Sequence, residues 1–113
     1  MPAWVKEILE VELKKVDNAP QGLWKRYVSL EEDGHGMVFG MGSFAPGEEI
    51  SHSHEEEELF FTLKGQGEAI WKINGKEYRA DLKPGTAFYK TSDIYHTMRN
   101  NGDEPLVGIF FKV

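Results

Sequence analysis

Short apolar runs broken by turn residues recur along this chain. Runs of this length, bounded by glycine, proline and asparagine, are typical of the strands of an all-β domain. The pattern predicts eight strands, at residues 24–30, 37–44, 59–64, 68–73, 77–80, 86–90, 96–99 and 106–112. We therefore expect an all-β fold.

The turns between these runs are marked more clearly than the runs themselves. Asn74-Gly75 can adopt the positive φ angles of a type I′ turn, which predicts a tight hairpin between residues 69–73 and 76–80. Turn residues mark further reversals at 45–47, 83–85 and 101–103. The sequence contains no internal repeat and no low-complexity linker.

The stretch 4–16 fits two patterns. Five apolar residues approximate one face of a helix: Trp4, Val5, Ile8, Leu9 and Val16. Leu9, Val11 and Leu13 instead alternate with polar residues, as in a strand. We favour a short extended segment, and the helical alternative stays open at the level of sequence.

Length and composition indicate one small domain, residues 1–113, since 40% hydrophobic residues can supply a single core. The net charge is −6, with a pI near 5.2 and no basic run, so nucleic acid is not an expected partner. There are no cysteines, which excludes disulfides, thiolate catalysis and cysteine zinc sites. Any metal site must therefore use histidine and carboxylate.

No targeting or membrane segment is evident. The N-terminus lacks a basic start followed by a continuous apolar stretch, so it does not resemble a secretory signal. No window approaches the roughly 20 apolar residues that are needed to cross a membrane. We therefore expect a cytoplasmic protein that does not bind membranes.

The candidate site lies in the segment 47–65. In an extended strand, His52, His54 and Glu58 would project from one face because all three positions are even. His96, much later in the chain, is a fourth candidate ligand. Imidazole nitrogens and a carboxylate oxygen suit divalent transition metals, and four protein ligands on an octahedral ion leave two positions open for chemistry.

Each candidate ligand could instead be an ordinary surface residue with no role in metal binding. An isolated His-x-His pair on a polar loop is usually solvated, and the acidic run 55–58 would by itself be a solvated segment. Three of the four histidines in the chain are nevertheless among the four candidate ligands, which favours a metal site. His35 lies in a turn-like segment and is expected at the surface. Glu55, Glu56 and Glu57 are assigned no role.

Two motifs resemble those of the cupin family. The first is Gly-x4-His-x-His-x3-Glu-x6-Gly, from Gly47 to Gly65, with one residue fewer than usual before the first histidine. The second is matched at three of its positions: Gly85, His96 and Asn100. Thr91 and Asp93 stand where proline and glycine are usual. The resemblance covers residues 24–113 and leaves 1–23 as a peripheral N-terminal segment.

The resemblance implies a single jelly-roll β-barrel of antiparallel strands. It also implies one divalent metal ion (iron, manganese, nickel, zinc or copper) held by His52, His54, Glu58 and His96. The family includes dioxygenases, sugar isomerases and epimerases, lyases and proteins that only bind small ligands. We expect a metal-dependent enzyme acting on a small organic substrate. The alternative is a non-catalytic barrel that binds a small molecule or carbohydrate, with a structural or anchoring metal.

Strand parity predicts the surroundings of the metal. Glu58, Phe60 and Thr62 should share the metal-facing side, with three apolar side chains of the same strand on the opposite face. A homodimer is the preferred cover for that face, and the N-terminal segment or a second sheet of the same chain are the alternatives. Five aromatic residues are candidate pocket walls: Phe60, Trp71, Phe88, Tyr89 and Tyr95. Ile94 and Met98 should share the side of His96, and Arg99 should face away.

Other catalytic interpretations are weak. Ser51 and Ser53 flank His52, but neighbouring residues of a strand face opposite sides and do not readily form a nucleophile and base pair. Gly65-Gln66-Gly67 is too short for a dinucleotide fingerprint and joins two strands, whereas that motif needs a strand followed by a helix.

Overall fold

The computed structural model describes residues 13–16, 19–28, 38–52 and 57–112. These residues form ten strands: β1 (Leu13–Val16), β2 (Ala19–Val28), β3 (Val38–Phe44), β4 (Glu49–His52), β5 (Glu58–Lys64), β6 (Gly67–Ile73), β7 (Lys76–Leu82), β8 (Ala87–Lys90), β9 (His96–Arg99) and β10 (Leu106–Lys112). The described part of the chain contains no helix long and apolar enough to span a bilayer.

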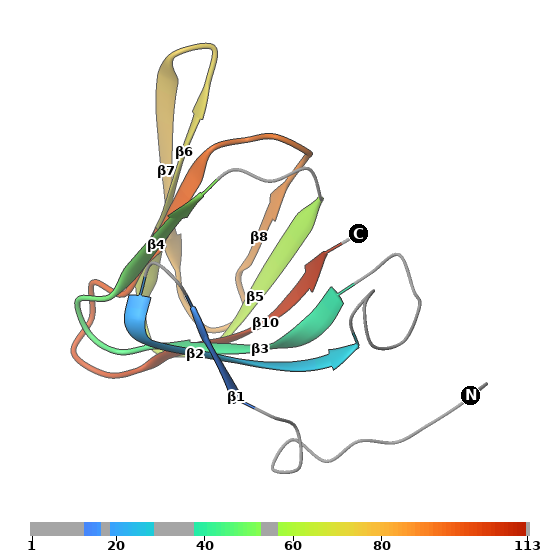
Figure 1. The fold of residues 1–113 in the computed structure, drawn as a ribbon. Helices are drawn as coiled ribbons and strands as arrows, with labels where there is room; N and C mark the ends of the chain where they lie inside the picture. Colours follow the sequence, from blue (N-terminus) through green and yellow to red (C-terminus); the bar gives the residue numbers. More distant parts are fainter. Residues whose placement is uncertain (1–12, 17–18, 29–37, 53–56, 113) are drawn as a thin grey trace.

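The strands form two antiparallel sheets that face one another around a shared core (Figure 1). The first sheet has six strands in the order β1-β2-β3-β10-β5-β8, and the second has four in the order β4-β9-β6-β7. The chain therefore crosses repeatedly between sheets. This arrangement confirms the expected all-β jelly-roll fold.

The core lies between the two sheets, where alternate residues of strands such as β5, β9 and β10 point inward. In β5 the buried residues are Glu58, Phe60 and Thr62, as strand parity predicted. The fully or nearly buried apolar residues are Phe44, Ile50, Phe60, Ala69, Leu82, Phe88, Met98, Leu106 and Phe110. The core is thus filled from both sheets, with bulky aromatic rings supplied by the six-stranded sheet.

The predicted strands agree well with the structure in the second half of the chain. The last two, 96–99 and 106–112, match β9 and β10. β4 was not predicted, because its four residues carry only one buried apolar side chain, Ile50. Of the stretch 4–16, residues 13–16 form an extended edge strand, and the rest lies outside the described residues. The six-stranded sheet also takes in β2, which crosses the boundary expected at residue 23.

The predicted hairpin is confirmed. Asn74 and Gly75 have φ angles of 53° and 79°, and Ile73 pairs directly with Lys76. Asparagine and glycine accept this left-handed backbone at little cost, so the turn follows from the sequence. The hairpin of β6 and β7 extends beyond the other strands at one end of the barrel (Figure 1).

Candidate metal centre

Several strand ends meet at the end of the barrel from which the hairpin extends. β4 ends at His52, which is the register partner of His96 at the start of β9. Trp71, near the end of β6, is the partner of His96 on its other side. In the opposite sheet, β5 begins with Glu58. Residues from both sheets therefore converge on one rim.

Glu58 and His96 meet across the core. Nε2 of His96 lies 3.0 Å from Oε1 of Glu58, and their side chains are 0% and 1% exposed. Nδ1 of His96 lies 3.1 Å from the carbonyl oxygen of Ile94. A carbonyl only accepts, so Nδ1 carries a hydrogen that it donates to Ile94, and Nε2 is the ring nitrogen that faces the carboxylate.

This arrangement fits a metal ion. An imidazole nitrogen without a hydrogen and an ionised carboxylate oxygen are both acceptors and repel one another. At 3.0 Å, a proton or a metal cation between them removes this repulsion. Two ligand atoms that each lie about 2.1 Å from a metal and at right angles to one another are separated by about 3.0 Å. A backbone carbonyl that fixes the tautomer of a ligating histidine is also the usual outer partner in such sites. The pair therefore has the spacing and chemistry of two adjacent ligands.

Two lysines flank Glu58 in the six-stranded sheet. Lys90 and Lys112 are its register partners on the neighbouring strands β8 and β10. Nζ of Lys112 lies 3.6 Å from Oε2 of Glu58, while the buried Lys90 donates a hydrogen bond to the carbonyl of Thr91. Cations at these positions favour the ionised form of the carboxylate, which is the form that binds metal. Sequence reasoning left Lys90 unplaced and missed Lys112, although its even position on the strand 106–112 places it on the inner face.

The two other predicted ligands are less completely described. The backbone register puts residue 52 on the face of the four-stranded sheet that carries His96. His54 lies outside the described residues, as does His35. No group of three potential metal ligands is found within the described residues alone. The set of four ligands therefore stays a prediction, with Glu58 and His96 brought together and residue 52 beside them.

One premise of the sequence argument was wrong. His52, His54 and Glu58 were taken to lie on a single extended strand, but β4 ends at His52 and β5 begins at Glu58 in the opposite sheet. Even numbering is therefore not what places residue 52 and Glu58 at one rim. They lie there because the chain passes from one sheet to the other between β4 and β5.

The aromatic candidates separate into three groups. Phe60 is core filling and is fully buried. Phe88 packs beside His96, with ring centroids 5.8 Å apart, and Trp71 packs beside Phe88 at 5.3 Å. Tyr89 and Tyr95 are 55% and 53% exposed and lie at the surface, outside the buried core.

Several smaller predictions can be settled from neighbouring contacts. Tyr89 donates a 2.6 Å hydrogen bond to Oε2 of Glu57, which raises the pKa of the phenol because the bond favours its protonated form. Met98 shares the buried side of His96, and Arg99 faces the other way, as expected. The hydroxyl of Ser51 lies 2.7 Å from that of Thr97, its cross-strand partner, so Ser51 has a structural partner other than histidine.

The departure from the second motif is accommodated in the turn before His96. Asp93, where glycine is usual, has a φ angle of 62°. This left-handed conformation favours glycine, and aspartate is among the residues that tolerate it best. Asp93 therefore adopts the left-handed backbone that glycine favours. The chain then enters β9 with His96 fully buried.

Comparison with solved structures finds the same fold at low sequence identity. A predicted oxalate decarboxylase from Thermotoga maritima is 23% identical, with a TM-score of 0.77 over 97% of this chain and 98% of the other. The polyketide cyclase RemF from Streptomyces resistomycificus is 14% identical, with a TM-score of 0.81 over 97% and 78%. The CENP-C cupin domain from Drosophila melanogaster is 17% identical, with a TM-score of 0.80 over 99% and 79%.

A search of curated proteins found no match. The structural similarities support the fold alone, because identities this low carry no activity from one protein to another. Comparison with protein families gives a more specific result, since residues 40–111 match the family described as cupin domain. This match spans most of the chain and includes both motifs from Gly47 onward. The chain therefore belongs to the cupin family.

Proposed function

We propose that this cupin binds one divalent transition metal through His52, His54, Glu58 and His96, and that it is an enzyme acting on a small organic substrate. The observation that carries the proposal is the contact between Nε2 of His96 and Oε1 of Glu58 at 3.0 Å. Both groups are buried and come from opposite sheets. An imidazole nitrogen and a carboxylate oxygen held this close together are suited to binding a divalent transition metal.

The bound ion would supply open coordination positions that activate oxygen or polarise a carbonyl group. The chain's own residues prepare that site. The carbonyl of Ile94 holds the ring of His96 in one tautomer, and Lys112 holds Oε2 of Glu58. Phe88 and Met98 are buried beside His96 and exclude water from this side of the site.

The reaction class is proposed only as metal-dependent chemistry of the kinds found in this family: oxygenase, isomerase or lyase. Two structural neighbours are named for activities on organic compounds, an oxalate decarboxylase and a polyketide cyclase. These names support an organic substrate without choosing it. The alternative is a binding barrel without turnover, and the likeness to the CENP-C domain, which is not named for a reaction, leaves room for it.

Metal content tests the ligand set directly. We expect about one iron, manganese, nickel, zinc or copper per chain in protein purified without an affinity tag, and a loss of most of it in His54→Ala and His96→Ala. His35→Ala is the matched control and should keep its metal. Full metal content in either ligand variant would overturn this assignment.

Turnover then separates the two functions. With metal-loaded protein, oxygen uptake or conversion of a bound organic acid would support the enzyme. Stoichiometric ligand recovered unchanged after long incubation would support the binding barrel instead.

We also propose that the protein is a homodimer, formed through the outer face of the six-stranded sheet. Alternate residues of β5 and β10 are apolar and exposed there, including Leu59, Phe61, Leu63 and Phe111. Contiguous apolar surface of this kind on a small domain is typical of an interface.

A further inference from the structure

The hairpin of β6 and β7 has two chemically different faces. Its inner positions carry Ala69, Trp71, Ile73, Lys76, Tyr78 and Ala80, and its outer positions carry five charged residues and one apolar residue: Glu68, Ile70, Lys72, Glu77, Arg79 and Asp81. The inner face continues the face of the sheet that carries His96, because Trp71 and His96 are register partners. The division follows from strict alternation along both strands.

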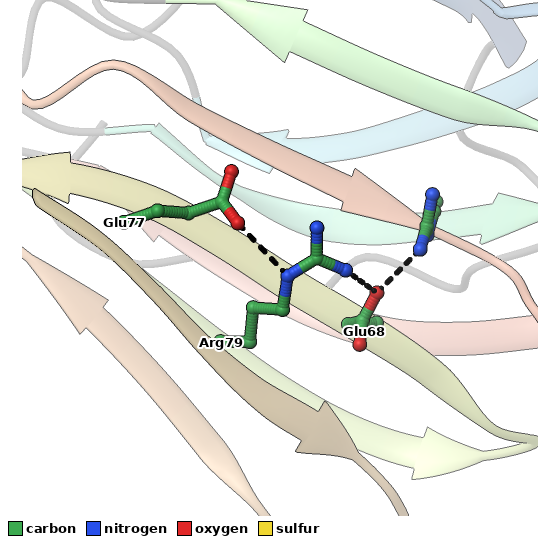
Figure 2. Close-up of polar contacts among 4 residues, drawn as sticks. Glu68, Glu77 and Arg79 are labelled. Carbon is green, nitrogen blue, oxygen red and sulfur yellow. Dashed lines mark hydrogen bonds and ion pairs between the residues drawn. The ribbon is translucent and has the colours of Figure 1, made fainter.

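Polar contacts within the outer face account for its charged residues. One oxygen of Glu68 lies 2.6 Å from Arg99 and 3.3 Å from Arg79, and Arg79 also contacts Glu77 at 3.0 Å (Figure 2). These charges lie on the surface and support the two strands by mutual pairing. The outer face therefore has a structural role.

On the inner face, a row of rings leads from the hairpin to the candidate metal ligand. Trp71 and Tyr78 are stacked, with centroids 5.9 Å apart and planes at 14°. Trp71 next contacts Phe88 at 5.3 Å, and Phe88 contacts His96 at 5.8 Å. At the outer end of the row, Nζ of Lys76 lies 5.2 Å from the ring of Tyr78.

The outer half of this row is accessible. Tyr78 is 37% exposed and Ile73 is 43% exposed, while Trp71 is partly buried against the core. Cross-strand packing explains why Trp71 and Tyr78 stack on each other. Cross-strand packing does not explain why an apolar surface with a single cation extends past the barrel rim on the side of His96. Exposed apolar surface beside a candidate metal site is typical of ligand binding.

We propose that this surface, formed by Trp71, Ile73, Tyr78 and Lys76 and here called the hairpin platform, binds the planar aromatic ring of an organic acid and presents it to the metal centre. The inference rests on the proposed function for the reacting site. Flat rings stack on tryptophan and tyrosine, and the ammonium of Lys76 can contact a carboxylate on the ring.

A carbohydrate fits the platform less well. Sugar hydroxyls need several hydrogen-bonding side chains, and the inner face of the hairpin offers three: the indole N–H of Trp71, the hydroxyl of Tyr78 and the ammonium of Lys76. The carboxylates and guanidinium groups that could bind a sugar all lie on the outer face. An aromatic acid matches both the ring surface and the single positive charge.

Binding of sodium 2-naphthoate, measured by calorimetry, tests the platform. Two probes are matched to it: 2-naphthamide has the same flat rings without the charge, and decalin-2-carboxylate has the charge without flat rings. We expect naphthoate to bind more tightly than either. Trp71→Leu and Tyr78→Leu should each weaken naphthoate binding about three- to tenfold, which corresponds to one lost aromatic contact.

Lys76→Met should weaken naphthoate about two- to fivefold and leave naphthamide unchanged. Lys72→Met is the matched control, because it removes a lysine from the outer face of the same hairpin, and it should leave naphthoate binding unchanged. Tyr78 is exposed, so its variant keeps the test informative if Trp71→Leu fails to fold. Equal binding of decalin-2-carboxylate, or unchanged naphthoate affinity in the Tyr78 variant, would overturn the platform.

Metal content is measured on the same samples and separates this inference from the proposed function. Protein with one metal per chain that fails to bind naphthoate would overturn the platform and leave the metal site standing. Protein without metal that binds naphthoate with the expected dependence on Trp71 and Tyr78 would support the platform and contradict the metal-dependent function.

Discussion

Asn100 is a motif residue whose structural role can be derived from its contacts. Its side chain is buried and donates hydrogen bonds to the carbonyls of Phe44, at 2.9 Å, and Glu104, at 2.7 Å. Its own carbonyl accepts a 2.9 Å bond from the amide of Gly102. Asn100 therefore closes the turn after β9 and joins it to β3, away from the candidate ligands.

We expect Asn100→Ala to lower the free energy of unfolding by about 2–4 kcal/mol, because it removes three hydrogen bonds made by a buried side chain. Urea denaturation measures this change. Asn100→Asp is the control of equal size and should retain the bond from Gly102. Metal content per folded chain should stay at the wild-type level in both variants, and its loss would show that Asn100 acts at the metal site instead.

Individual site residues were predictable from the sequence to different degrees. Glu58 and His96 follow from the spacing of the two motifs, and the structure brings them together. Lys112 did not follow, because its contact with Glu58 depends on β10 lying beside β5, a pairing of distant segments that no local pattern reveals. Tyr95 has the opposite parity to His96, and its side chain is 53% exposed, so strand parity points it away from the candidate ligands.

At the scale of elements, alternation and turn residues predicted most strands of the second half of the chain. The hairpin at Asn74-Gly75 needed only local chemistry, since both residues accept positive φ angles. β4 needed more, because its position depends on pairing with β9, 46 residues further along the chain at Ser51 and Thr97. Short edge strands of this kind are fixed by tertiary pairing more than by their own sequence.

Gly108 shows how tightly β10 packs against β5. A Cβ at this position would collide with the ring of Phe60, which occupies the space above the glycine. We expect Gly108→Ala to lower the free energy of unfolding by about 1–3 kcal/mol through overpacking. Thermal or urea denaturation measures the loss.

Adding Phe60→Leu to the Gly108→Ala variant is the control for this clash. Phe60→Leu alone should destabilise by opening a cavity, and the double variant should be more stable than the sum of the two single changes predicts. Simple additivity would contradict direct contact between the two positions.

At the scale of the whole molecule, the six-stranded sheet separates two surfaces with different roles. Its inner face carries Glu58 and the lysines beside it, and its outer face is apolar over three adjacent strands. The rows across the outer face are Leu59, Phe111 and Phe39, followed by Phe61, Ile109 and Met41. Phe39 and Phe111 also pack edge to face, with centroids 6.4 Å apart.

A second copy of the chain suits this face better than a partner with a charged surface. The rows contain no charged residue, whereas the chain carries a net charge of −6, so two copies can approach here without bringing like charges together. A two-fold axis through the face would set β5 of one copy against β10 of the other, and both strands present apolar side chains at the same spacing.

We therefore expect light scattering after size exclusion to give about twice the chain mass of 12.9 kDa. Phe61→Glu places a charge within the rows, where it would be desolvated in the dimer, so this variant should be monomeric while it keeps its metal and its fold. Tyr95→Glu, an exposed aromatic of another strand region, is the control and should stay dimeric. A monomeric wild type would mean that the chain's own N-terminal segment, or nothing, covers the face, and a Phe61→Glu dimer would place the interface elsewhere.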